Sequence, residues 1–154
     1  MKVIKIGTDQ KVDLIKGDIH LTIGNFDGVH LGHKNILSDM VAQAKNCGSK
    51  IAVLTFIPHP KKILNEFFEN YLINSYEERR EILKGLEIDY LLEIEFTRDF
   101  STMCPEAFFR KFVIESSHPS KIYLGHDFVF GSGKKGDFNL AKNICLEHKI
   151  DVIS

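Results

Sequence analysis

"GNFDGVHLGH", residues 24–33, follows an apolar run and precedes a stretch with helical periodicity. Glycines at positions 24, 28 and 32 allow a tight turn and a close approach of the backbone to a ligand. The helix that we expect to begin near His33 would direct unpaired backbone N–H groups and a positive dipole at whatever lies above it. The stretch therefore predicts a phosphate site where a strand ends and a helix begins.

Two histidines, His30 and His33, lie three residues apart, so both can face the same side of the first helical turn. Two imidazoles of adjustable charge there would neutralise a phosphoryl group that develops extra negative charge. The alternatives are a zinc pair completed by Asp27, or two ordinary surface histidines. Zinc proteases place a glutamate between their two histidines, which "HLGH" lacks, and surface histidines would leave the glycines unexplained. We therefore favour the phosphate site.

Outward from this stretch, strand-like and helix-like segments alternate along the chain. Apolar runs predict strands at residues 18–23, 50–56, 90–94 and 121–125, with another beginning at 150. Helical spacing, a capping box from Ser75 to Glu78 and a first-turn Pro105 predict helices at residues 33–44, 75–86, 105–113 and 139–148. This alternation predicts one α/β domain over residues 1–154, a Rossmann-like parallel sheet with helices on both faces.

In such a sheet, ligands bind beyond the carboxyl ends of the strands. Two further stretches fall there: "TFIPHP" (55–60) and "GHDFVFGSGKKGD" (125–137). On physical grounds alone the first is a rigid strand exit, and the alternating phenylalanines of the second are more often core residues than ring-stacking platforms. Its glycines are expected to loosen a basic loop, which would also suit a flap over a phosphorylated ligand.

Composition limits the possible functions. The chain has 154 residues, of which 44% are hydrophobic and 27% charged, and a formal net charge of −1. No global field would recruit nucleic acid or an anionic membrane, so an anion must be bound locally. Charged residues interrupt the N-terminal region, which argues against a signal peptide or membrane span. Three scattered cysteines argue against a disulfide framework or cysteine-based zinc site, and we expect a cytoplasmic location.

The three stretches, in this order and spacing, resemble the N-terminal adenylyltransferase module of the bacterial riboflavin kinase/FMN adenylyltransferase family. The resemblance runs from about residue 18 to residue 154. "HLGH" matches the HxGH motif of the nucleotidyltransferase superfamily, and the other matches indicate its flavin branch. The resemblance implies an Mg²⁺-dependent reaction of ATP with FMN that gives FAD and pyrophosphate. It implies only these small-molecule partners, without nucleic acid or membrane; protein partners stay unknown.

The resemblance also assigns residues to roles. It implies that His30 and His33 are catalytic. The implied nucleotide-binding residues are Gly24, Asn25, Phe26, Asp27, Gly28, Gly32 and Asp127. The implied flavin-binding residues are Phe56, Pro58, His59, Pro60, Phe128 and Phe130. Asp127 could serve the ribose or Mg²⁺, and no metal ligand is assigned.

The expected chemistry needs no side-chain base, because the second pKa of the FMN phosphate is about 6 and the nucleophile is already ionised. In this family a second phosphate motif, a Ser/Thr-rich turn ending in arginine, and a riboflavin kinase barrel lie beyond the position of Ser154. We therefore expect a domain truncated at its C-terminal end, without the kinase module. Two alternatives stay open: transfer of an adenylyl or cytidylyl group to another phosphorylated substrate, and a nucleotide- or flavin-binding module without catalysis.

Overall fold

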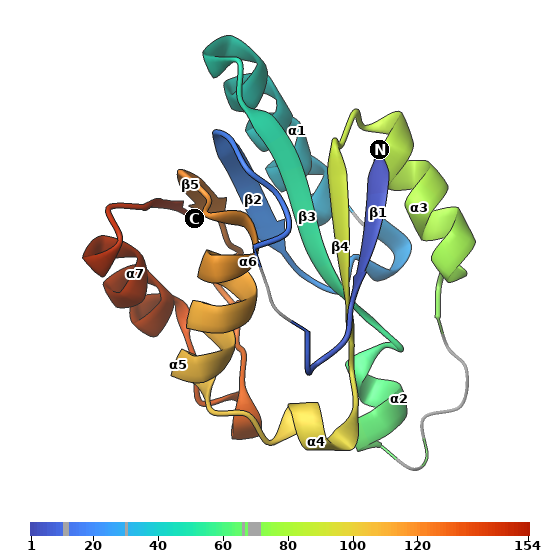
Figure 1. Cartoon of the computed structure of the whole chain (residues 1–154). Coiled ribbons are helices and arrows are strands. Elements are labelled where there is room, and N and C mark those ends of the chain that lie inside the picture. The colour runs from blue at the N-terminus through green and yellow to red at the C-terminus, as the bar shows by residue number, and fades with distance from the viewer. Residues whose placement is uncertain (11–12, 30, 66, 68–71) are drawn as a thin grey trace.

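The computed structural model describes residues 1–10, 13–29, 31–65, 67 and 72–154, except for the side chain of residue 31. A six-stranded sheet lies at its centre, and all its strand pairs are parallel (Figure 1). The strands are β1 (Lys2–Ile6), β2 (Ile19–Ile23), β3 (Lys50–Ile57), β4 (Tyr90–Glu95), β5 (Lys121–Tyr123) and β6 (Asp151–Ile153). The predicted α/β fold with a Rossmann-like parallel sheet is confirmed.

The strand order β1-β4-β3-β2-β5-β6 determines where a ligand can bind. From β2 the chain adds β3 and then β4 on one side, and it then crosses over to add β5 and β6 on the other. The direction of growth therefore reverses at β2, and open α/β sheets bind ligands at the carboxyl ends of the strands where this reversal occurs. "GNFDGVHLGH" begins directly after the last residue of β2.

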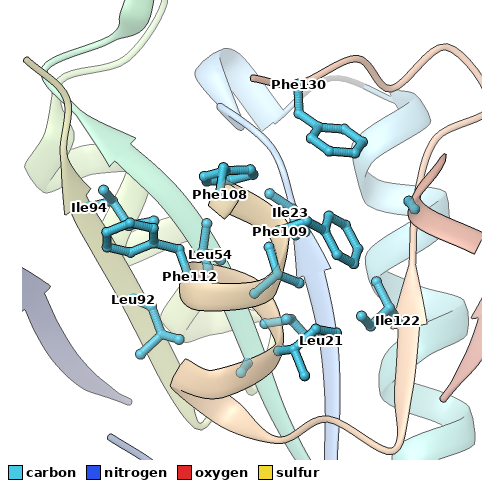
Figure 2. Close-up of a cluster of buried hydrophobic side chains, with 14 of the residues drawn as sticks. Leu21, Ile23, Leu54, Leu92, Ile94, Phe108, Phe109, Phe112, Ile122 and Phe130 are labelled. Atoms are coloured by element: carbon cyan, nitrogen blue, oxygen red, sulfur yellow. The ribbon is translucent and has the colours of Figure 1, made fainter. Parts of the chain in front are cut away.

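Helices cover both faces of the sheet. One face packs against α1 (Leu31–Cys47) and α3 (Tyr76–Gly85). The opposite face carries the larger core, with an aromatic-rich helical segment formed by α5 (Pro105–Phe108), η2 (Phe109–Ile114) and α6 (Glu115–Ser117) (Figure 2). The remaining elements are α7 (Phe138–Glu147), also on this face, and the short η1 (Asp27–Val29), α2 (Pro60–Leu64), α4 (Arg98–Ser101) and η3 (Ser132–Lys134). No helix within the described part of the chain is long and apolar enough to span a membrane.

Local sequence signals are mostly confirmed. Ser75 and Glu78 form the predicted capping box of α3, and Pro105 occupies the first turn of α5. The helix after β2 begins at Leu31, two residues before the predicted start. The strand β1 was not predicted; it is an edge strand that pairs with β4, and Ile6 is its one fully buried residue. Lysines are tolerated on such an edge. Because they interrupt the apolar run, the sequence pattern does not indicate a strand there.

Candidate functional site

The segment from Gly24 to Val29, here called the switch-point loop, connects β2 to α1. Its first N–H donates to the carbonyl oxygen of Leu54 at 3.1 Å, which keeps the loop against β3. Phe26, Gly28 and Val29 have φ values of 50°, 73° and 37°. Positive φ is unfavourable for a residue with a Cβ, by about 1–3 kcal/mol, unless surrounding contacts hold it. Phe26 and Val29 are buried, so core packing supplies those contacts.

His33 lies in the first turn of α1, directly beside this loop. Its ring centroid is 4.9 Å from that of Phe26, and the side chain is half-buried, while Gly32 before it is exposed. The first N–H groups of a helix have no acceptor within the helix, so the turn that carries His33 can bind an anion. His30, its predicted catalytic partner, lies outside the described residues.

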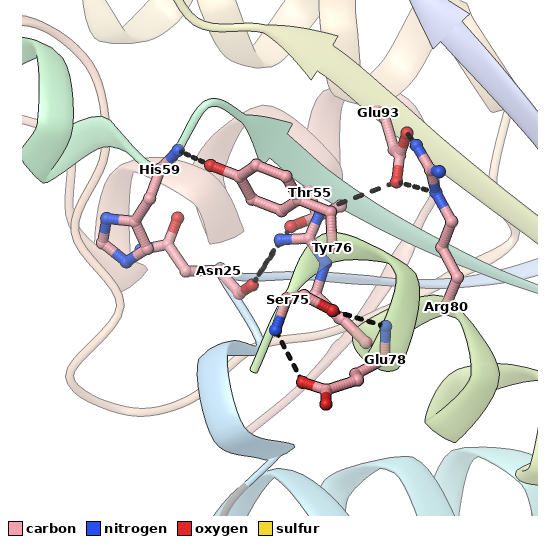
Figure 3. A network of polar contacts seen from close by, with 9 residues as sticks. Asn25, Thr55, His59, Ser75, Tyr76, Glu78, Arg80 and Glu93 are labelled. Carbon is pink, nitrogen blue, oxygen red and sulfur yellow. Dashed lines mark hydrogen bonds and ion pairs between the residues drawn. The ribbon is translucent and has the colours of Figure 1, made fainter. Parts of the chain in front are cut away.

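A buried polar network lies under the switch-point loop (Figure 3). The carbonyl oxygen of Asn25 accepts hydrogen bonds from Thr55 Oγ1 at 3.3 Å and from Arg79 Nη1 at 3.0 Å. Arg79 Nη2 lies 3.6 Å from Glu93 Oε1. Arg80 binds both oxygens of the same carboxylate, through Nε at 2.9 Å and Nη2 at 2.6 Å. Residues from β3 and α3 thus hold one carbonyl of the loop, and Glu93 of β4 pairs with both arginines of α3.

Burial and ion pairing shift the pKa values of the two arginines in this network. Burial lowers the pKa of the Arg79 guanidinium, although Glu93 opposes that shift. For Arg80, which is more exposed, the hydrogen bonds to Glu93 raise the pKa. Both guanidinium groups carry a positive charge, because arginine is not deprotonated in proteins. The network therefore combines two cations with one carboxylate.

Asp27 and Gly28 contact the segment that precedes α3. Asp27 Oδ1 accepts hydrogen bonds from the backbone N–H groups of Ile73 at 2.9 Å and Asn74 at 3.4 Å. A Cβ on Gly28 would lie 2.8 Å from Ile73 Cδ1. Both residues, predicted to bind nucleotide, thus also have structural partners within the chain.

"TFIPHP" passes from β3 into α2. His59 is only 7% exposed and forms the N-cap of α2: its Nδ1 accepts from the N–H of Lys61 at 3.1 Å. The backbone N–H of His59 donates to the hydroxyl of Tyr76 at 2.9 Å, also visible in Figure 3. Burial lowers the pKa of His59, so its ring is neutral at pH 7. Pro58 is half-buried, and Pro60, also half-buried, occupies the first turn of α2.

The two later stretches meet in one group of phenylalanine rings, here called the aromatic cluster. Phe108 has its ring centroid 6.1 Å from that of Phe56 and 6.0 Å from that of Phe130. Phe128 stacks on Phe130 at 5.3 Å with an interplanar angle of 22°. Phe130 is 6% exposed and belongs to the core, whereas Phe56 and Phe128 are half-buried at the margin. The cluster also includes Phe96, Phe100, Phe109 and Phe112.

The expectation that glycines loosen the third stretch is wrong for two of its glycines, Gly131 and Gly136. Phe130 and Gly136 exchange backbone hydrogen bonds of 3.0 and 2.9 Å, which close the intervening turn. A Cβ on Gly136 would lie 2.6 Å from the Phe130 ring, and one on Gly131 would lie 2.5 Å from Pro105 Cα. These two glycines permit close packing. Asp127 lies earlier in this stretch and is exposed after β5.

Sequence reasoning missed the residues that support the loop from below. Thr55 stood in a quoted stretch, but only its phenylalanine, histidine and prolines were given roles. Arg79 and Tyr76 belong to a helix with ordinary periodicity, so nothing local distinguishes them. Glu93 did leave a signal: it is a carboxylate inside the otherwise apolar run "YLLEI", which predicts a buried charge with a partner.

Metal binding is limited by the side chains available. Within residues 1–10, 13–29, 31–65, 67 and 72–154, no three or more His, Cys, Asp or Glu side chains are grouped so that they could hold a metal ion. Magnesium in phosphoryl-transfer sites is usually bound by one or two carboxylates together with substrate phosphates.

Comparison with known proteins identifies the family. The family model described as FAD synthetase matches residues 13–154, nearly the whole chain. The chain belongs to the FAD synthetase family. A bifunctional riboflavin kinase/FMN adenylyltransferase from Buchnera aphidicola subsp. Schizaphis graminum is 31% identical over 90% of the chain and 45% of its own length. An FAD synthetase from Listeria monocytogenes is 33% identical over 87% of the chain and 54% of its own length. The chain thus spans about half the length of these relatives.

Structural comparison agrees on the fold. The crystal structure of a macrolide-efflux protein from Streptococcus pneumoniae has a TM-score of 0.78 and 26% sequence identity, covering 98% of this chain and 50% of that one. Pantothenate synthetase from Thermus thermophilus has a TM-score of 0.59 at 11% identity, covering 99% of this chain and 60% of that one. The second likeness concerns the fold alone.

Proposed function

We propose that this chain transfers the adenylyl group of ATP to FMN, giving FAD and pyrophosphate. The observation that carries the proposal is the FAD synthetase family match over residues 13–154, because that range contains the switch-point loop and both later stretches. Riboflavin kinase activity, named for bifunctional relatives, is outside the proposal, since the match covers less than half of the Buchnera protein. ATP and FMN are metabolites of the cytoplasm, where we place the reaction.

The switch-point loop and the first turn of α1 would hold the ATP phosphates. Backbone N–H groups at a helix start bind phosphate oxygens, and the helix dipole favours their negative charge. His33 lies in that turn beside the buried Phe26 ring, so its position is supported by packing. An imidazole there can donate to the oxygens that gain charge as the α-phosphate is attacked. We give His30 the same role on the strength of the motif.

The acceptor would approach from the neighbouring strand ends. An ionised phosphate oxygen of FMN attacks the α-phosphorus of ATP in line, forming one P–O bond as the bond to the pyrophosphate oxygen breaks. The isoalloxazine ring needs a flat apolar surface, and Phe56 and Phe128 are half-buried at the margin of the aromatic cluster. Pro58, His59 and Pro60 continue this wall after β3. Phe130, which is buried, would support Phe128 from behind.

Magnesium would be bound mainly by the phosphates of ATP. Its chemistry there is to neutralise charge on the leaving pyrophosphate. Asp127, exposed after β5, can contribute one carboxylate to the metal or a hydrogen-bond acceptor to the ribose. These two roles are distinguished by comparing Asp127→Asn with the unmodified chain across a titration of Mg²⁺.

The test is a product assay. The chain is incubated with ATP, Mg²⁺ and either FMN or one of a panel of other phosphorylated acceptors, and products are identified by mass. Among these acceptors, we expect only FMN to react with ATP, giving FAD and pyrophosphate. His33→Ala should lower the rate about tenfold or more, because a hydrogen bond to a charged group contributes about 1.5–3 kcal/mol.

His148→Ala is the matched control, since it removes an exposed imidazole at the far end of α7. Its rate should equal that of the unmodified chain. A product formed with another acceptor but not with FMN would reassign the substrate. ATP and FMN binding without any product would instead indicate a binding module.

A further inference from the structure

Arg79 is buried under the switch-point loop without a full set of acceptors. The residue is 3% exposed, and its Nη1 donates to the Asn25 carbonyl at 3.0 Å. Its Nε has no hydrogen-bond partner among the described residues, and its Nη2 is 3.6 Å from Glu93, beyond hydrogen-bond distance. Burying a guanidinium costs several kcal/mol unless it is paired and hydrogen-bonded. Its well-formed bond to the loop therefore needs an explanation.

Neutralising Glu93 is not that explanation. Arg80 already binds both oxygens of this carboxylate, at 2.9 and 2.6 Å. A single bidentate arginine satisfies a carboxylate in charge and geometry. The second cation, Arg79, leaves the network with one net positive charge, directly beneath the loop. Two contacts distinguish Arg79 from Arg80: its guanidinium lies over the Tyr76 ring, with Cζ 5.1 Å from the centroid, and it alone donates to the loop, at Asn25.

That contact sets the direction of a peptide group. The Asn25–Phe26 peptide is trans, so its C=O and N–H point in opposite directions. Arg79 and Thr55 hold the carbonyl oxygen toward the interior from two sides. The N–H of Phe26 is consequently directed to the opposite side of the loop, away from Arg79.

We propose that Arg79 is a positioning residue for nucleotide binding: it fixes the Asn25–Phe26 peptide so that the Phe26 N–H faces the ATP phosphates. This inference rests on the proposed function, which places those phosphates at the switch-point loop. The guanidinium itself does not touch ATP, because its Nε and Nη2 are fully buried. Its net positive charge also favours the anion from behind the loop.

The chain offers a matched pair of variants. Arg79→Met and Arg80→Met each remove one cation from Glu93, but only Arg79→Met removes a donor to Asn25. Thr55→Val is a third variant: it removes the other donor without altering charge, at a fully buried position where valine has nearly the same shape. ATP and FMN dissociation constants are measured separately for each variant, at a temperature well below every melting temperature.

We expect Arg79→Met to weaken ATP binding about tenfold or more, the effect of losing a charge-assisted hydrogen bond, and to leave FMN binding within about twofold. Arg80→Met should lower the melting temperature but leave both dissociation constants unchanged. Thr55→Val should weaken ATP binding by about threefold to tenfold, as expected for one neutral hydrogen bond, and it tests the inference even where Arg79→Met does not fold.

Equal losses of ATP affinity in Arg79→Met and Arg80→Met would overturn the inference, and so would parallel losses for ATP and FMN, because both indicate a general loss of structure. Unchanged ATP affinity in Thr55→Val would overturn the role of the peptide. An unmodified chain that binds neither ATP nor FMN would instead refute the proposed function. The two failures are therefore distinguishable.

Discussion

Replacing Gly28 by alanine tests whether the switch-point loop is held by packing against the chain itself. Gly28 has φ +73°, and an added Cβ would meet two carbon atoms of Ile73 at 2.8 and 2.9 Å. Gly48, which follows α1, has φ +72° with nothing within 4 Å of the corresponding position. The two glycines thus share nearly the same positive φ and differ in their surroundings. Gly48→Ala measures the conformational cost, and Gly28→Ala adds the contact with Ile73.

The magnitudes follow from these two terms. A left-handed conformation costs a residue with a Cβ about 1–2 kcal/mol. Alanine recovers about 0.4–1 kcal/mol by restricting the unfolded chain. Gly48→Ala should therefore reduce the free energy of unfolding by about 0.5–1 kcal/mol. Ile73 is 72% exposed and can rotate away, so its displacement in Gly28→Ala should add only the cost of a strained rotamer, about 0.5–1.5 kcal/mol.

Urea unfolding followed by circular dichroism measures these differences, and thermal melting provides a check at about 2–4 °C per kcal/mol for a chain of this size. The double variant Gly28→Ala/Ile73→Ala, compared with Ile73→Ala, should lose less stability than Gly28→Ala does, because alanine removes the two closest carbon atoms of Ile73 and keeps only its Cβ, at 3.1 Å. Gly28→Ala that is no less stable than Gly48→Ala would refute the packing argument. So would a double variant in which removing the Ile73 side chain brings no relief.

Two further predictions concern pH and the aromatic cluster. Burial lowers the pKa of His20 and His59 below the usual 6.5, so the unfolded chain binds more protons just below that pH. Their contribution to stability is present above about pH 6.5 and is lost as pH falls through the folded pKa values. The urea unfolding midpoint should therefore decline over that pH range, and it should decline less in His20→Asn than in the unmodified chain. An equal decline in the two proteins would contradict this. Phe130→Ser should lower the melting temperature strongly, since truncating a buried phenylalanine costs about 3–5 kcal/mol. Phe128→Ser should weaken FMN binding with ATP binding nearly intact, and a parallel loss of both affinities and of stability would make Phe128 a packing residue.

The fold was predictable because its signals are local. Each of the five apolar runs that we interpreted as strands pairs in the sheet, and the capping box at Ser75 determines where α3 begins. The strand that was missed, β1, lies at an edge, where half of its hydrogen-bonding groups face away from the sheet and charged residues are tolerated. A search for continuous apolar runs finds central strands of a parallel sheet and loses such an edge.

The position of the candidate site was also predictable, but its supports were not. A glycine-rich segment after a strand indicates where a phosphate can bind, and the strand order places that segment at the reversal point. Gly131 and Gly136 were interpreted wrongly because the absence of a Cβ can serve either mobility or close packing. Only the neighbours decide: at Gly136 the neighbour is the ring of Phe130.

The residues that shape the loop lie far away in sequence. Asn25 is held by Thr55 and Arg79, 30 and 54 positions later, and Asp27 is held by the backbone of Ile73, 46 positions later. No pattern within a helix or strand spans such separations, since local periodicities concern residues three or four apart in helices and two apart in strands. A chain could therefore retain "GNFDGVHLGH" unchanged and still lose the loop conformation when Thr55 and Arg79 are replaced. It follows that the motif predicts phosphate binding only together with its distant donors, and these must be identified from the fold.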